Sequence, residues 1–159
     1  MSDAKTLRAE IEKQFHDAKA TILVKGNPIY DLGILDKADE YAYSLLGDLA
    51  GKMVLEIGYG MGEHTIRLAK RSAQVYAIDI SPEMVEQARQ RVKEEGLGNQ
   101  VIVLEMNAEE MEFVEGIFDA VFGHSVLHHT DSDDWFATSL LWDTYYLRVL
   151  RSYSCGDRN

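Results

Sequence analysis

A strand that runs into three closely spaced glycines and then into a helix limits this chain to few folds. The segment reads Val54-Leu-Glu-Ile-Gly-Tyr-Gly-Met-Gly-Glu-His-Thr-Ile-Arg-Leu68, with glycine at positions 58, 60 and 62. Glycine permits a sharp turn between strand and helix, and its missing Cβ lets a ligand approach the backbone at the N-terminus of the helix. We therefore expect this turn to hold a ligand.

Apolar runs alternate with helical segments along the same half of the chain. The runs read as strands buried on both faces, because their apolar residues follow one another directly. The expected strands are Met53 to Ile57, Gln74 to Asp79, Val101 to Glu105 and Ala120 to His124, with helices at Gly62 to Arg71 and Pro82 to Glu95. The acidic link from Met106 to Ile117 has room for only a short helix. This order predicts an α/β fold, a doubly wound parallel sheet of the Rossmann-like kind.

Helical periodicity also flanks this unit. Helices are expected from Asp3 to Val24 and from about Lys37 to Leu49, the second ending at Gly51. Another is expected to open at Asp131 and to place Phe136, Leu140, Leu147 and Leu150 on one side. We expect a helical flank or lid at residues 1–50, the α/β domain at 51–151 and a frayed tail at 152–159.

Composition excludes several classes of partner. The chain has 159 residues, which fits one domain, and its 16 basic against 27 acidic residues give a net charge of −11. Such a charge repels phosphate backbones, so we expect no nucleic-acid partner. The single cysteine, Cys155, forms neither an intramolecular disulfide nor a cysteine metal cage, which fits a reducing, cytoplasmic setting. No apolar run approaches the ~20 residues of a membrane span, so no membrane partner is expected either.

An acid at the end of the second strand suits a nucleoside ligand. Asp79 follows Gly58 by 21 residues, where a carboxylate accepts hydrogen bonds from ribose hydroxyls. A dinucleotide loop needs glycine at position 63, but Glu63 stands there and would set its charge beside a pyrophosphate. S-adenosylmethionine has no phosphate, and Glu56 would pair with its ammonium group. The spacing favours this cofactor over NAD, and a nicotinamide-dependent oxidoreductase is kept as a distant alternative.

From about Lys52 to Thr130 the chain resembles the class I S-adenosylmethionine-dependent methyltransferases, in particular their small-molecule branch. The resemblance rests on four motifs and implies the class I methyltransferase fold. The residues that it implies for cofactor binding are Glu56, Gly58, Gly60 and Gly62 around the methionine part, Asp79 and Ile80 at the ribose and adenine, Asn107 and Ala108 at the adenine, and His124 facing the methyl donor. Asn107 stands where the family usually has Asp, and its amide oxygen still accepts a hydrogen bond.

The histidines allow two interpretations. For His64, His124, His128 and His129 the sequence shows no carboxylate or cysteine at ligand-like spacing, so no metal site is predicted. An imidazole with a near-neutral pKa takes protons readily, which makes His124 and His128 the candidate catalytic bases.

The resemblance stops before the family's usual end. Members of this type continue through a Lys-Pro-Gly-Gly-like turn into three more strands, whereas here Leu147-Arg-Val-Leu-Arg151 leads into Ser-Tyr-Ser-Cys155. We therefore expect a truncated domain with only the first four strands, in which the fourth strand offers an open edge to a second copy or a partner.

Two functions follow from these patterns. The first is the transfer of a methyl group from S-adenosylmethionine to a small organic acceptor by direct displacement. The alternative is a cofactor-binding but catalytically incomplete fragment, or a subunit that binds a partner.

Overall fold

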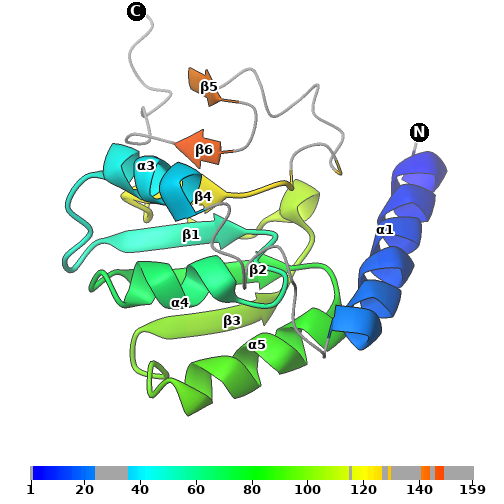
Figure 1. Ribbon diagram of the computed structural model, residues 1–159. Coiled ribbons are helices and arrows are strands. Elements are labelled where there is room, and N and C mark those ends of the chain that lie inside the picture. Colours follow the sequence, from blue (N-terminus) through cyan, green and yellow to red (C-terminus); the bar gives the residue numbers. More distant parts are fainter. Residues whose placement is uncertain are drawn as a thin grey trace, which may run out of the picture.

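Four parallel strands carry the fold (Figure 1). The structure is a computed structural model that describes residues 2–23, 36–114, 116–126, 129, 141–143 and 146–148, and the side chains of 6–18, 39–114, 116–126 and 129. The strands are β1 (Met53–Ile57), β2 (Gln74–Asp79), β3 (Val101–Glu105) and β4 (Ala120–Gly123), arranged in the order β3-β2-β1-β4. This confirms the α/β fold that the apolar runs predict, with β4 one residue shorter than expected.

Two helices make the crossovers between parallel strands. The helices are α4 (Glu63–Ala69), between β1 and β2, and α5 (Pro82–Glu94), between β2 and β3. At the start of α5 the Ser81 side chain accepts a hydrogen bond of 3.2 Å from the Met84 N–H, and Pro82 takes the first helical position, where no N–H is needed. The predicted start of this helix is thus confirmed.

The largest part of the core lies on one face of the sheet. Helices α3 (Asp36–Leu46), α4 and α5 lie on this face (Figure 1) and bury side chains such as Tyr43, Leu68, Val85 and Phe122. On the other face Leu55, Ile57 and Ile78 are buried under partly exposed residues, among them Tyr76, Phe113 and Phe118. The expectation of strands buried on both faces is therefore right for β1 but wrong for β3, because Ile102 is 45% exposed.

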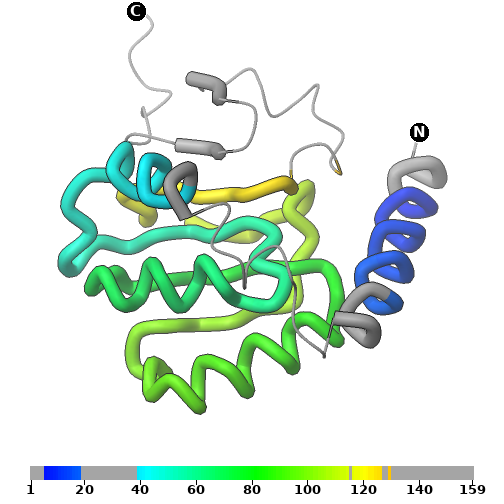
Figure 2. Tube along the Cα trace, viewed as in Figure 1, coloured from blue at the N-terminus to red at the C-terminus, as the bar shows by residue number. Residues whose placement is uncertain are grey.

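Helix α1 (Ser2–Leu23) lies beyond the carboxyl ends of the strands (Figures 1 and 2). Its Lys13 ammonium forms an ion pair of 3.3 Å with Glu105 at the end of β3, and Asp17 accepts the hydroxyl of Ser81 before α5. Two contacts thus hold α1 against the edge of the sheet. Among the described residues, no helix combines the length and apolar character that crossing a membrane requires.

Two predicted helices differ in the structure. Helix α3 ends at Leu46 and not at Leu49, because Gly47 already adopts the left-handed conformation, with φ at 73°, that ends a helix. Where the last helix is expected to continue, β5 (Leu141–Asp143) and β6 (Tyr146–Arg148) form an antiparallel pair, and β6 contacts β4. Aromatic residues favour strands, and the seven-residue spacing of Leu140 and Leu147 imitates a helix. The predicted helical residues Phe136, Leu140 and Leu150 lie outside the described residues.

Candidate functional site

A cavity of about 830 Å³ opens at the carboxyl ends of the strands. In doubly wound sheets this edge is where ligands bind, because the loops that follow neighbouring strands meet there. Seven of the predicted ligand residues line the wall: Gly58, Gly60, Asp79, Ile80, Asn107, Ala108 and His124. Helix α1 closes another side with Arg8, Glu12 and His16, which the sequence analysis did not assign to the site.

Both the left-handed backbone of Gly58 and the nearby Val126 side chain require glycine as the first glycine of the loop. Gly58 has φ at 67°, and a Cβ there would lie 2.4 Å from Cγ2 of Val126. The Gly58 N–H donates to the Ile78 carbonyl at 2.8 Å, which ties the loop to β2. The segment after β4 therefore packs directly on the loop, so that any side chain at position 58 would push the two apart.

The third glycine of the loop is required by its backbone conformation. Gly62 is the N-cap of α4 with φ at 77°, and a Cβ there would meet the Cβ of Ala88 in α5 at an ordinary contact distance of 3.4 Å. The left-handed backbone therefore favours glycine. Gly62, predicted to embrace the methionine part, does not line the cavity.

Asp79 lies between the glycine loop and the start of α5. Its carboxylate is 7% exposed and accepts hydrogen bonds from the Gly60 N–H at 2.9 Å and from the Ser81 N–H at 3.0 Å. Burial raises the pKa of Asp79, and these two backbone donors act against the rise because they stabilise the ionised form. The carboxylate is thus fixed on the cavity wall by two loops, with lone pairs remaining for ligand hydroxyls.

Glu56, predicted to contact the ammonium group, lies beneath the loop and does not line the cavity. Its side chain is 1% exposed and accepts a hydrogen bond of 2.6 Å from the Thr65 hydroxyl. Burial raises the pKa of Glu56 to about 8, against 4.5 for an ordinary glutamate. The carboxyl group therefore supports the loop from the core side.

Replacing Glu56 with glutamine is expected to flatten the dependence of stability on pH. Between pH 4.5 and about 8 the unfolded chain has released the Glu56 proton and the folded chain keeps it. The contribution of Glu56 to the free energy of unfolding is therefore fully present below pH 4.5 and is lost as the pH rises toward 8, by up to about 1.4 kcal/mol per pH unit. Glutamine keeps an acceptor for Thr65 but does not ionise.

Urea unfolding of both proteins at several pH values tests this expectation. The wild type should lose stability relative to Glu56→Gln as the pH rises. A difference between the two proteins that stays constant from pH 4.5 to 8 would contradict the raised pKa.

The segments after β2 and β3 form the part of the cavity where the sequence predicts adenine binding. Asn107 caps the short 3-10 helix η1 (Ala108–Glu110), and its Oδ1 accepts a hydrogen bond of 3.0 Å from the Glu109 N–H. Ile80 and Ala108 also line this part of the wall, together with Met84 and Met106, which the sequence analysis did not name. Met84 follows Asp79 closely along the chain and Met106 directly precedes Asn107, so this closeness is the sequence signal that could have identified both methionines.

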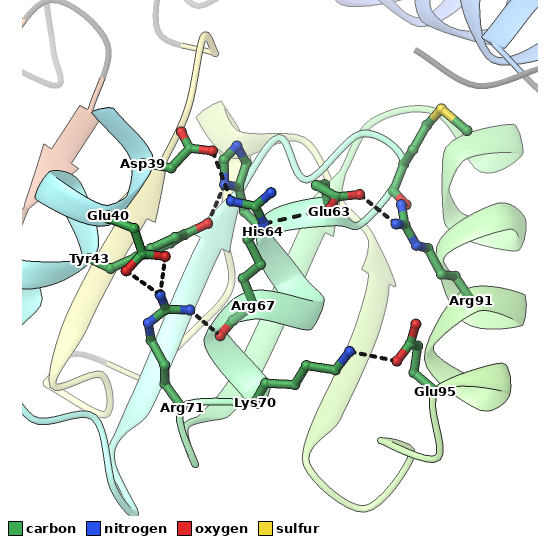
Figure 3. Close-up of polar contacts among 11 residues, drawn as sticks. Asp39, Glu40, Tyr43, Glu63, His64, Arg67, Lys70, Arg71, Arg91 and Glu95 are labelled. Atoms are coloured by element: carbon green, nitrogen blue, oxygen red, sulfur yellow. Dashed lines mark hydrogen bonds and ion pairs between the residues drawn. The ribbon is translucent and has the colours of Figure 1, made fainter. Parts of the chain in front are cut away.

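Two neighbouring histidines, His124 after β4 and His64 in α4, each have a pKa that burial lowers. His124 lines the cavity, and its ring centroid lies 4.8 Å from that of His64, which is 5% exposed. Burial lowers the pKa of His64 to about 3 and also lowers the pKa of His124. His64 shares a hydrogen bond with the Tyr43 hydroxyl (Figure 3). His128, the other predicted base, lies outside the described residues.

Ion pairs around helix α4 offset the negative charge of Glu63 (Figure 3). The Glu63 carboxylate pairs with Arg91 of α5 and lies 3.6 Å from the Arg67 guanidinium. Arg67 also pairs with the fully buried Asp39 at 3.3 Å. Because two guanidinium groups offset the charge of Glu63, the repulsion of a pyrophosphate that the sequence suggests is weaker than expected.

Comparison with known proteins finds matches among methyltransferases. Residues 54–141 match the family described as "Methyltransferase domain". A methyltransferase of Streptomyces halstedii is 30% identical over 109 residues, which are 67% of this chain and 38% of that protein. A ubiquinone/menaquinone biosynthesis C-methyltransferase of Hahella chejuensis is 29% identical over 131 residues, or 77% of this chain and 53% of that protein. The chain thus spans about half or less of the length of these relatives.

Solved structures agree with the fold. Magnesium protoporphyrin IX methyltransferase from Synechocystis, crystallised with bound S-adenosylmethionine, superposes with a TM-score of 0.65 at 25% identity, over 80% of this chain and 66% of that chain. Its complex with S-adenosylhomocysteine gives a TM-score of 0.64. The arrangement of strands and helices described above is therefore that of a known group of cofactor-binding enzymes.

Proposed function

Because this chain belongs to the methyltransferase-domain family, we propose that it moves a methyl group from S-adenosylmethionine to a small organic acceptor by direct displacement. The observation that carries the proposal is a glycine loop hydrogen-bonded to a buried carboxylate at the wall of a cavity. A volume of about 830 Å³ lies in the range of small-molecule sites, about 300 to 1,000 Å³.

The residues present fit this cofactor. Asp79 would accept hydrogen bonds from the ribose hydroxyls, and the backbone of Gly58 and Gly60 would follow the methionine part. Ile80 and Ala108 would flank the adenine, with Asn107 beside its amino group. When bound, the cofactor supplies an electrophilic methyl group on a positively charged sulfur.

The chain's own contribution to the reaction is alignment and a neutral base. Direct displacement needs the acceptor atom, the methyl carbon and the sulfur in one line, which a walled cavity enforces by restricting the acceptor's positions. His124 lines this cavity, and its lowered pKa keeps the imidazole unprotonated at neutral pH, so that it can take the proton of an acceptor hydroxyl or amine. His128 is proposed as the second candidate for this role.

Calorimetric titration of the purified protein tests cofactor choice first. We expect saturable binding of S-adenosylmethionine and S-adenosylhomocysteine and no binding of NAD. Saturable binding of NAD without binding of S-adenosylmethionine, by a protein whose circular dichroism shows it folded, would refute the proposal.

Transfer of a radiolabelled methyl group then tests the reaction. The Synechocystis and Hahella relatives suggest magnesium protoporphyrin IX and an intermediate of ubiquinone or menaquinone biosynthesis as first acceptors. We expect label in at least one acceptor class, and in His124→Asn a kcat that falls by a larger factor than the cofactor Kd rises. Cofactor binding with no transfer to any acceptor would instead indicate a binding-only protein.

A further inference from the structure

A cluster of one carboxylate and two imidazoles, none of them assigned to the cofactor, lines the same cavity. Glu12 and His16 lie one turn apart on α1, and His129 belongs to the segment after β4. All three line the cavity, with 21 to 27% of each side chain exposed. We propose that Glu12, His16 and His129 bind a divalent transition-metal ion of the Zn²⁺ type, which fastens α1 to the exit of β4.

The distances between the donor atoms suit such an ion. The Glu12 carboxylate oxygen Oε2 lies 2.9 Å from Nδ1 of His129 and 3.8 Å from Nε2 of His16, and the three ligand atoms all lie within 4.8 Å of one another. Donor atoms bound at about 2.1 Å to a tetrahedral ion are about 3.4 Å apart, so the two short distances bracket the ideal value. To reach the ideal separation of about 3.4 Å, the distances between these donor atoms need to change by about 0.4 to 1.4 Å.

The donor set selects the class of metal. Two imidazoles and one carboxylate suit Zn²⁺ and related transition metals, whereas Mg²⁺ and Ca²⁺ prefer oxygen ligands. Three protein ligands leave one coordination position of a tetrahedral ion open. Here a water molecule or a ligand in the cavity would occupy that position.

The position of α1 already brings the ligands together. The pair Glu12 and His16 shares one face of the helix because residues four apart are neighbours there. Lys13 holds the helix to Glu105, and Asp17 holds it to Ser81. The ion would therefore meet a site assembled by the fold, and the net charge of −11 favours a cation.

A second cluster of the same composition is a poorer site. Asp39, His64 and His124 also place their ligand atoms within 4.8 Å of one another. However, the buried Asp39 carboxylate pairs with Arg67 at 3.3 Å, and His64 Nδ1 is engaged by the Tyr43 hydroxyl. A metal ion there would stand beside the Arg67 guanidinium, which repels a cation.

Titration with ZnCl₂, in protein free of any polyhistidine tag and of chelating buffer, tests the site directly. The wild type should bind one Zn²⁺, and Glu12→Gln or His129→Asn should weaken binding about 100-fold or more, since even outer-shell partners of ligands account for about 10- to 100-fold. Glu10→Gln is the matched control, because it removes the same charge from an exposed position of α1 and should leave the Kd unchanged.

Absorption of the Co²⁺-loaded protein identifies the ligands without any measurement of activity. The visible bands should indicate four-coordinate nitrogen and oxygen ligation and should disappear in Glu12→Gln. A thiolate charge-transfer band would place the ion on Cys155, and equal Zn²⁺ binding in the wild type, Glu12→Gln and His129→Asn, or no binding by the folded wild type, would overturn the proposal. The titration omits S-adenosylmethionine, so its failure is separate from a failure of the proposed reaction.

Discussion

Asp79→Ala should weaken the binding of S-adenosylmethionine by about 100-fold or more. The carboxylate is buried on the cavity wall and is proposed to accept the ribose hydroxyls, and each hydrogen bond to a charged group contributes about 1.5 to 3 kcal/mol. The same carboxylate holds the Gly60 N–H, so its removal also releases the glycine loop. Calorimetric titration gives the Kd of both proteins.

Asp79→Asn separates the two roles of this side chain. Asparagine keeps one acceptor oxygen for a backbone N–H but loses the charge and the second acceptor. We expect an affinity between those of the wild type and Asp79→Ala, with circular dichroism showing both variants folded. Wild-type affinity in Asp79→Ala would remove Asp79 from the cofactor site.

Gly58→Ala should lower the free energy of unfolding by about 2 to 5 kcal/mol. A left-handed backbone costs a non-glycine residue about 1 to 2 kcal/mol. The new Cβ would also lie 2.4 Å from Cγ2 and 2.8 Å from Cβ of Val126, and such overpacking costs about 1 to 3 kcal/mol more. Urea unfolding measures the loss.

Gly51→Ala supplies the matched control. Gly51 has φ at 70°, close to the 67° of Gly58, but no heavy atom lies within 4 Å of its added Cβ. Its loss should be limited to the backbone term of about 1 to 2 kcal/mol. Adding Val126→Ala to Gly58→Ala clears the Cγ2 contact and leaves the Cβ contact, so it should recover part of the difference. If Gly51→Ala and Gly58→Ala lost equal free energy of unfolding, the Val126 side chain would have moved aside without cost, which would contradict the expected clash.

The parts of the fold that depend on neighbouring residues were predictable from the sequence. The four parallel strands and the Ser81 cap were expected within a residue or two, because buried strands and helix starts leave local patterns. The end of α3 was misplaced because Gly47 and Gly51 both adopt left-handed conformations and only the structure shows which ends the helix. The exposure of Ile102 depends on which helices cover each face, which no local pattern records.

In the candidate site too, residues fixed by their position along the chain were predictable, whereas those that depend on contacts with distant residues were not. Residues next to a strand end, such as Asp79 and Asn107, reach the cavity wall because the strand fixes their place. Glu56 lies inside the strand, where the alternation of side chains turns it toward α4 and Thr65. The contact of Glu12 with His129 joins distant parts of the chain, so the carboxylate near the histidines was not apparent from their spacing.

The order β3-β2-β1-β4 also sets the sequence in which the sheet opens. β1 is hydrogen-bonded on both sides, by β2 and β4, whereas β3 is bonded only by β2 among the described strands and leaves Ile102 in solvent. Local unfolding begins where few contacts are lost, so the edge strands β3 and β4 are expected to open before β1. The loop after β3 carries the part of the cavity proposed for adenine, and the loop after β1 carries the glycine turn. One part of the proposed site is therefore built on an edge strand that opens early, and the other on an inner strand that opens late.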